Sequence, residues 1–187
     1  MKKLICLVGF PGSGKSTALE FAKEFGAVVV MGDVVRKEAQ KKGIKITSES
    51  LGQIAKDLRK KGGPNVIADR TIITIKSLDD PIVFVDGIRS PNEYNYFCEN
   101  FPKVILVSVD APKEQRYKWM MERKREDDSL SLAELKARDA REVEFGVKKV
   151  MDLAEYQIAN KGSVDDLKTE CHDLFSSIIH QGGFDND

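Results

Sequence analysis

The chain has 187 residues, of which 41% are hydrophobic and 32% are charged. These proportions are ordinary for a globular protein, and the length suits one domain with room for an inserted subdomain. Thirty Lys and Arg residues balance thirty Asp and Glu residues, so no overall charge favours nucleic acid or a membrane surface as a partner. We therefore expect an anionic ligand to bind only at a local basic site.

The sequence also indicates a cytoplasmic location. No apolar run approaches the roughly 18 residues that suggest a membrane span. The N-terminus runs within a few residues into a predicted strand, which is unlike a secretory signal. The cysteines are far apart and lack Cys-x-x-Cys spacing, which favours a reducing compartment without a disulfide framework; they are Cys6, Cys98 and Cys171.

Five short apolar runs predict the strands of one sheet. The first four are nearly continuous rather than alternating, as in parallel strands that are covered on both faces. Between the first two runs, apolar residues recur at helical spacing, and Gly26 stands where a helix end favours a left-handed residue. Strand–helix–strand units in series predict a doubly wound α/β fold with a five-stranded parallel sheet. The runs are Leu4–Val8, Ala27–Met31, Ile82–Val85, Val104–Val109 and Tyr156–Ala159.

Two further regions carry helical patterns. Residues 37–76, between the second and third predicted strands, indicate a helical insertion with one apolar stripe over residues 51–58. The segment Asn65–Ile75 is β-branched, and we favour helix there. After the fourth strand, one helix is expected from Pro112 to a charged break near residue 125, and Ser131-Leu-Ala-Glu134 has the capping-box spacing that opens another.

Residues 9–16 read Gly-Phe-Pro-Gly-Ser-Gly-Lys-Ser and satisfy the phosphate-loop pattern G-x-x-x-x-G-K-[ST]. The glycines let the backbone wrap closely around phosphate, Lys15 brings a positive charge to the β- and γ-phosphates, and Ser16 offers a hydroxyl to Mg²⁺. The helix that follows presents its unpaired N–H groups to the same anion. We predict ATP and Mg²⁺ as ligands, bound through Gly9, Pro11, Gly12, Ser13, Gly14, Lys15, Ser16 and Thr17.

The phosphate loop alone does not separate a kinase from a GTPase, an ATPase motor or a transporter subunit. Two later segments resemble the nucleoside-monophosphate kinases: Gly-Asp-Val-Val-Arg at residues 32–36, and Asp-Gly-Ile-Arg at residues 86–89, which is one residue shorter than in adenylate kinases. The resemblance implies that Arg36 and Arg89 grip the phosphate of an acceptor beside Asp33. Asp86, a carboxylate that ends an apolar strand, is expected to help hold Mg²⁺.

The same resemblance implies a short lid at residues 123–141 and a base-binding turn near the fifth strand. In the lid, Arg123, Arg138 and Arg141 are the predicted catalytic arginines, since such a residue can neutralise charge that develops during phosphoryl transfer. The segment Ala154-Glu-Tyr-Gln-Ile-Ala-Asn160-Lys-Gly162-Ser resembles the turn that lies against the adenine in dephospho-CoA kinases. Asn160 and Gly162 are therefore predicted to bind the ATP base.

Over nearly its whole length the chain resembles an archaeal family of P-loop proteins related to adenylate, cytidylate and dephospho-CoA kinases. Three hypotheses stay open. The first, which we favour, is phosphoryl transfer to a nucleoside monophosphate such as AMP, which needs no general base. The second is transfer to a ribose hydroxyl, as in dephospho-CoA kinases, with Asp33 as the base. The third is an ATP-binding switch or weak ATPase that acts with a partner, and the oligomeric state is not predicted.

Overall fold

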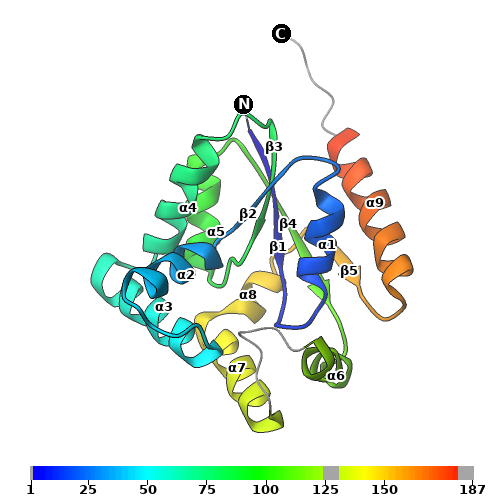
Figure 1. The fold of residues 1–187 in the computed structure, drawn as a ribbon. Coiled ribbons are helices and arrows are strands. Elements are labelled where there is room, and N and C mark those ends of the chain that lie inside the picture. Colours follow the sequence, from blue (N-terminus) through cyan, green and yellow to red (C-terminus); the bar gives the residue numbers. More distant parts are fainter. Residues whose placement is uncertain (1, 124–130, 181–187) are drawn as a thin grey trace.

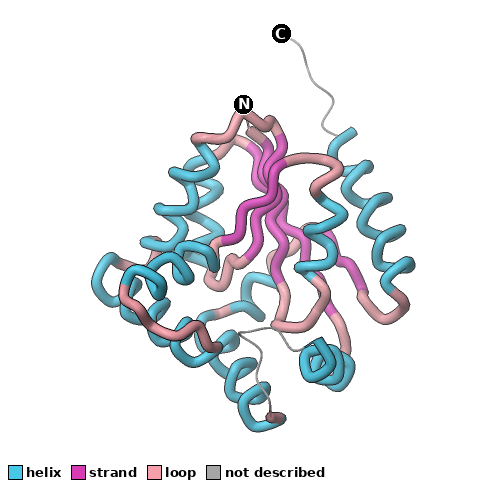
Figure 2. Tube along the Cα trace, in the orientation of Figure 1, coloured by secondary structure: helices cyan, strands magenta, loops and turns pink. Residues whose placement is uncertain are grey.

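The computed structural model describes residues 2–123 and 131–180 and contains a five-stranded parallel sheet (Figures 1 and 2). The strands lie in the order β2-β3-β1-β4-β5. All five stand where the apolar runs predict them: β1 (Lys3–Val8), β2 (Ala27–Val30), β3 (Ile82–Asp86), β4 (Lys103–Asp110) and β5 (Tyr156–Ala159). The prediction of a five-stranded parallel α/β sheet is confirmed.

Helices cover both faces of this sheet (Figure 1). One face carries α1 (Lys15–Ala22) and α9 (Val164–His180), which pack together over an apolar cluster centred on Phe84 and Phe175. The other face carries a larger cluster to which five helices contribute. They are α2 (Gly32–Lys41), α3 (Ser48–Gly62), α4 (Val66–Lys76), α5 (Pro91–Asn100) and α8 (Val147–Met151).

Two more helices, α6 (Lys113–Arg123) and α7 (Leu132–Phe145), lie below the carboxyl ends of the strands (Figure 1). The sheet order brings functional segments to that edge, because β1 is central and is flanked by β3 and β4. Leu7 pairs with Asp86 on one side and Val8 pairs with Ser108 on the other. The loop that follows Val8 therefore begins beside the carboxylate that ends β3.

The segment between β2 and β3 folds into α2, α3 and α4, so the helical interpretation of residues 65–75 is confirmed. The interpretation of Gly26 as a left-handed helix end is wrong. Helix α1 ends at Ala22 with Lys23 as its cap, and Gly26 has no positive φ. The glycine instead allows the backbone before β2 to pass close to the start of β3, because a Cβ there would collide with the carbonyl oxygen of Ile82.

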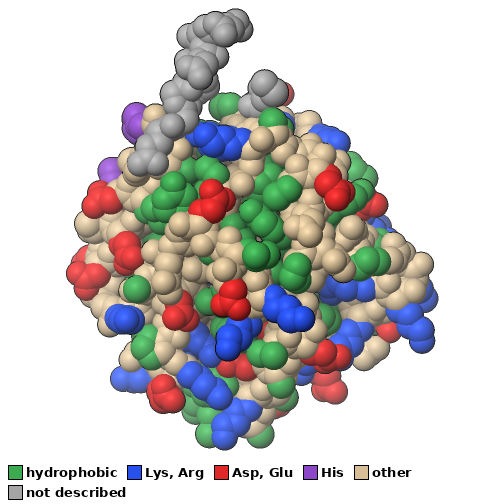
Figure 3. Space-filling model, turned by 180° about the vertical axis from the view of Figure 1, so that it is seen from behind, with side chains coloured by type: hydrophobic (Ala, Val, Ile, Leu, Met, Phe, Trp, Pro, Cys, Tyr) green, Lys and Arg blue, Asp and Glu red, His purple; other side chains and the backbone are tan. Residues whose placement is uncertain are grey.

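The surface agrees with the balanced composition. Seen from behind, Lys and Arg side chains are interspersed with Asp and Glu side chains, and apolar groups gather in the upper half (Figure 3). None of the helices in the described part of the chain is both long and apolar enough to cross a membrane.

Candidate active site

The phosphate loop joins β1 to α1 at the carboxyl edge of the sheet (Figure 1). Gly12 and Gly14 have φ values of 79° and 103°, a region that residues with a Cβ rarely adopt. Helix α1 begins at Lys15, so its N-terminal N–H groups point toward the loop. The side chain of Asn160 fixes the loop from the β5 side, since its Nδ2 donates to the carbonyl oxygen of Ser13 at 3.0 Å. Asn160, predicted to bind the base, thus also positions the loop.

Lys15 lies folded against its own loop. Its Nζ donates to the carbonyl oxygens of Gly9 at 2.7 Å and Phe10 at 3.1 Å. Burial lowers the pKa of the Lys15 ammonium, while the negative charges of Asp86 and Glu142 act in the opposite direction. A phosphate group would supply a charged acceptor in place of the two carbonyls, and would favour the ammonium form.

Arg116 supports the loop from α6. This side chain is buried, and its Nη1 donates to the carbonyl oxygen of Pro11 at 2.8 Å. Its guanidinium also forms a two-pronged ion pair with Asp139 on α7, at 3.1 and 2.7 Å, and the hydroxyl of Tyr117 donates to the same carboxylate. The phosphate loop is therefore tied to α6 and, through Asp139, to α7, which belongs to the predicted lid. Sequence reasoning did not select Arg116, because only the fold brings it to Pro11.

The residues predicted for Mg²⁺ fit such an ion. Asp86 and Ser16 both line the same cavity, and the Oδ1 atom of Asp86 is buried with no hydrogen-bond partner among the described residues. A buried carboxylate oxygen without a partner at this position can accept a hydrogen bond from a metal-bound water. Within residues 2–123 and 131–180 no group of three His, Cys, Asp or Glu side chains forms a metal cage. Mg²⁺ would thus take most of its ligands from phosphate and water, as it commonly does.

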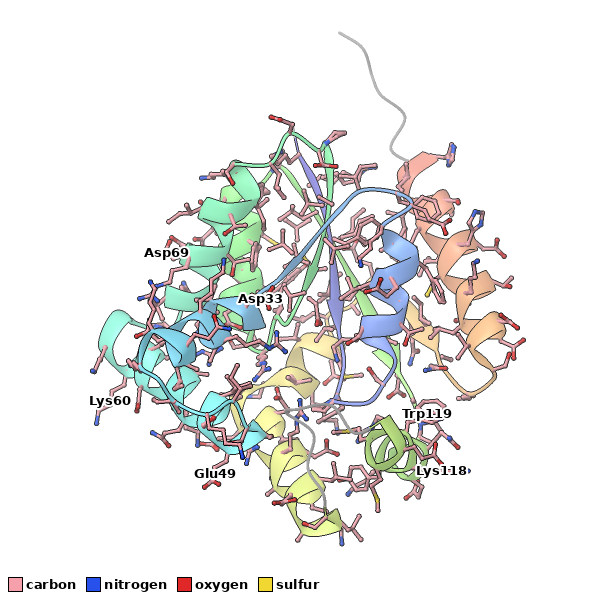
Figure 4. All side chains as sticks on the ribbon, viewed as in Figure 1. Asp33, Glu49, Lys60, Asp69, Lys118 and Trp119 are labelled. Carbon is pink, nitrogen blue, oxygen red and sulfur yellow. The ribbon has the colours of Figure 1, made fainter. Side chains whose placement is uncertain are left out.

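We refer to the cavity around the phosphate loop as the large cavity; it has a volume of about 670 Å³, within the usual range for small-molecule sites. All predicted phosphate-loop residues except Ser13 line it, as do Asn160 and Gly162. Two lining residues on α6 were missed, Trp119 and Glu122, which stand one helical turn apart. Figure 4 shows Trp119 on α6 and Asp33 on α2, on opposite sides of β1. Trp119 therefore lines the large cavity from α6, on the far side of β1 from α2.

The predicted acceptor arginines lie next to the large cavity. Arg36 and Arg89 line it together with Arg138 and Glu142. A second, small cavity of about 80 Å³ adjoins it and shares these four residues. Asp33 lines neither cavity: its side chain is 54% exposed and its Oδ1 accepts from Arg36 Nη1 at 2.8 Å. The structure thus places Arg36 and Arg89 at the site and turns Asp33 partly toward solvent.

Buried carboxylates hold Arg89 and its neighbour Arg59 in place. Arg89 Nη1 lies 3.1 Å from Glu142 Oε1. Glu93, which is fully buried, accepts from the Arg89 backbone N–H at 3.0 Å and from Arg59 Nη2 at 2.6 Å. The Ser90-Pro-Asn-Glu93 spacing, with the Ser90 hydroxyl capping α5, was a signal that could have identified Glu93. No local pattern identifies Arg59 or Glu142.

The lid arginines have different positions. Arg138 lines both cavities, whereas Arg141 lines only the small one and donates to the hydroxyl of Ser48 at 2.8 Å. Arg123 ends α6, and its side chain, like residues 124–130, lies outside the part of the chain that the structure describes. The lid as a whole therefore stays a prediction.

This arrangement defines a P-loop site with an adjoining arginine-rich pocket. A family model described as an AAA domain matches residues 8–136, so the chain belongs to this class of P-loop proteins. Two solved structures share the fold. The shikimate kinase from Acinetobacter baumannii, in complex with shikimate, has a TM-score of 0.59 at 18% identity, covering 95% of each chain. The dephospho-CoA kinase from Campylobacter jejuni has a TM-score of 0.58 at 19% identity, covering 95% of this chain and 98% of that one.

Relatives in sequence define the family. A UPF0200 protein of Hyperthermus butylicus is 39% identical over 180 residues, which are 96% of each chain. A UPF0200/UPF0201 protein of Archaeoglobus fulgidus is 45% identical over 168 residues; the match covers 88% of this chain but only 52% of that relative. The chain belongs to the UPF0200 family and has the kinase-like P-loop fold that the sequence predicts.

Proposed function

We propose that the protein transfers the γ-phosphoryl group of ATP to a small acceptor, and that a nucleoside monophosphate such as AMP is the first acceptor to test. The observation that carries this proposal is the junction of the two cavities. Arg36, Arg89 and Arg138 line both of them, so a donor on the phosphate loop and an acceptor in the small cavity would meet beside three guanidinium groups.

In this reaction an oxygen of the acceptor bonds to the γ-phosphorus while the bond from that phosphorus to the β,γ-bridging oxygen breaks, and ADP leaves. Lys15 and the loop N–H groups hold the donor, and Arg36 and Arg89 hold the acceptor in line. Positioning of this kind can supply about 7–11 kcal/mol of the barrier. Ser16 and Asp86 would hold Mg²⁺, which when bound neutralises charge on the phosphates. A phosphate oxygen is already nucleophilic, so a nucleoside monophosphate requires no base.

The second candidate is transfer to a hydroxyl group, which a carboxylate in the lining of both cavities favours. The small cavity, of about 80 Å³, also suits a compact acceptor that reaches into the large one. A hydroxyl loses its proton during attack, so a carboxylate is required as acceptor of that proton. Asp33 is the carboxylate that the sequence predicts for this role, while Glu142 lines both cavities.

The test is ADP release from ATP–Mg²⁺ with AMP, CMP, UMP, GMP, dephospho-CoA, shikimate or no added acceptor. A rate that rises strongly with one acceptor supports phosphotransfer and names the substrate. A slow rate that no acceptor changes contradicts it and favours the ATP-dependent switch. Nucleotide binding can be followed separately, because Trp119 is the sole tryptophan and lines the large cavity, so its fluorescence should change when ATP binds.

A further inference from the structure

The small cavity lies where the acceptor helices meet α7. Helices α2 and α3 and the loop after β3 form three of its walls, and α7 forms the fourth. Its apolar walls include Val35, Leu51, Ala55 and Phe145. Arg36, Arg89, Arg138 and Glu142 line both cavities and mark where the two meet, whereas the lining residues from α3 belong to the small cavity alone.

The lining of the small cavity is rich in arginine. Among the described residues that line it, one, Glu142, is acidic and five are arginines: Arg36, Arg59, Arg89, Arg138 and Arg141. Carboxylates lie against three of these guanidinium groups, because Asp33 pairs with Arg36, Glu93 pairs with Arg59 and Glu142 pairs with Arg89. Arginines still outnumber these carboxylates around a cavity of about 80 Å³.

Two of these arginines, Arg59 and Arg141, line the small cavity but not the large one, and Arg59 is paired with the buried Glu93. Arg141 has a different environment. Its Nη2 donates to the Ser48 hydroxyl at 2.8 Å and to the Ser48 carbonyl oxygen at 3.4 Å. Both oxygens are uncharged, so these contacts position the guanidinium without neutralising it. A half-buried cation held in this way is suited to receive an anion.

A glycine in helix α3 leaves room for the Arg141 guanidinium. Gly52 lies inside α3, where glycine destabilises a helix relative to alanine. A Cβ at Gly52 would lie 3.2 Å from Arg141 Nε, closer than such atoms normally pack, and 3.4 Å from its Cδ. The absence of a side chain therefore lets Arg141 approach the helix closely.

We infer that Arg141 and Ser48 form a subsite for a second anionic group of the acceptor, a carboxylate or a phosphate, remote from the oxygen that receives the phosphoryl group. The acceptor is then a compact hydroxy acid or a phosphorylated alcohol. A nucleoside monophosphate has its anionic group at the reacting end, and would place an uncharged base against Arg141. The inference rests on the proposed phosphotransfer. Of the two proposed kinds of acceptor, it favours the one that reacts through a hydroxyl group.

The first experiment measures anion binding by calorimetry. The protein is saturated with a non-hydrolysable ATP analogue and Mg²⁺, so that the phosphate loop is filled, and is then titrated with inorganic phosphate or, separately, with acetate. Comparison of the two titrations shows which anionic group the subsite prefers. We expect Arg141→Gln to weaken binding of the preferred anion at least tenfold, and Ser48→Ala to weaken it a few fold.

Two control variants separate binding from helix docking. Lys56→Gln removes another contact between α3 and α7, the ion pair of Lys56 with Glu144 at 3.0 Å, without touching the cavity. Arg70→Gln removes an arginine on α4 that lines neither cavity. Neither control should change anion binding. Equal losses in Lys56→Gln and Arg141→Gln would overturn the subsite, as would a wild-type protein that binds neither anion or an Arg141→Gln variant that binds normally.

The second experiment measures ADP release with nucleoside monophosphates, small hydroxy acids and phosphorylated alcohols. The inference predicts a response to an acid or a phosphorylated alcohol that Arg141→Gln loses mainly through a raised KM. A response to nucleoside monophosphates alone, unchanged in Arg141→Gln, would refute the subsite and leave phosphotransfer standing. Arg141-dependent anion binding in a protein that no acceptor activates would instead retain the subsite and refute the phosphotransfer.

Discussion

The two halves of the site are built differently. The phosphate-binding half comes from one continuous segment, residues 9–17, between a buried strand and the helix that follows it. The acceptor half takes arginines from α2, α3, the loop after β3 and α7. A continuous segment carries its geometry in its own sequence, whereas an assembled pocket depends on how separate helices pack. The acceptor half should therefore be more sensitive than the phosphate half to changes in α2, α3 and α7.

The largest effect is expected from Lys15→Ala. This change removes the ammonium that faces the phosphates, and loss of one preorganised charge of this kind costs on the order of 10²–10³ in rate or more. The fold should survive, because Lys15 Nζ donates to loop carbonyls that can bind water instead. Acceptor-dependent ADP release and circular dichroism measure the two effects. Normal turnover by a folded Lys15→Ala protein would contradict the proposed function.

The next largest effect is expected from Arg116→Ala, which tests how far the phosphate loop depends on α6 and α7. Arg116→Ala leaves the Asp139 carboxylate without its partner and removes the donor to Pro11. Breaking a buried ion pair in this way destabilises a protein by about 3–5 kcal/mol. Urea denaturation should show a loss of this size, together with weaker ATP binding by Trp119 fluorescence.

The matched control for Arg116→Ala is Glu20→Gln, which removes an exposed ion pair with Lys23. That change should alter the free energy of unfolding by less than about 1 kcal/mol. If both variants lose similar stability, Arg116 does not hold the loop in the way described.

A third prediction concerns the acceptor half and its two carboxylates. If the acceptor reacts through a hydroxyl, loss of the base should lower kcat about 10²–10⁴-fold. We expect Glu142→Gln to raise KM, because Arg89 loses the carboxylate that lies 3.1 Å away. We expect the fall in kcat in whichever variant, Asp33→Asn or Glu142→Gln, removes the base. Assays of both variants with the same acceptor over a range of pH identify the base. Equal and small effects on kcat in both would favour an acceptor that needs no base.

The smallest effect is a pH dependence of ATP binding. Burial lowers the pKa of Lys15 in the free protein, and bound phosphate should raise it again. Between these two pKa values binding takes up a proton, so affinity should fall as pH rises through this window. Lys15→Arg should remove the dependence, because a guanidinium stays protonated. Calorimetry in two buffers of different ionisation enthalpy measures the proton uptake; none in the wild type would show that Lys15 does not titrate there.

The sequence by itself determined the parts of this protein that are local. Apolar runs specified the five strands, and glycine spacing with Lys15 and Ser16 specified the phosphate loop, because strand and loop conformation are encoded within a few residues. Arg36 and Arg89 were found because each follows a strand end. The tertiary structure decided the rest. Arg116 reaches Pro11 across 105 positions and Arg141 reaches Ser48 across 93, and only the packing of α6 and α7 against the remaining fold creates those contacts.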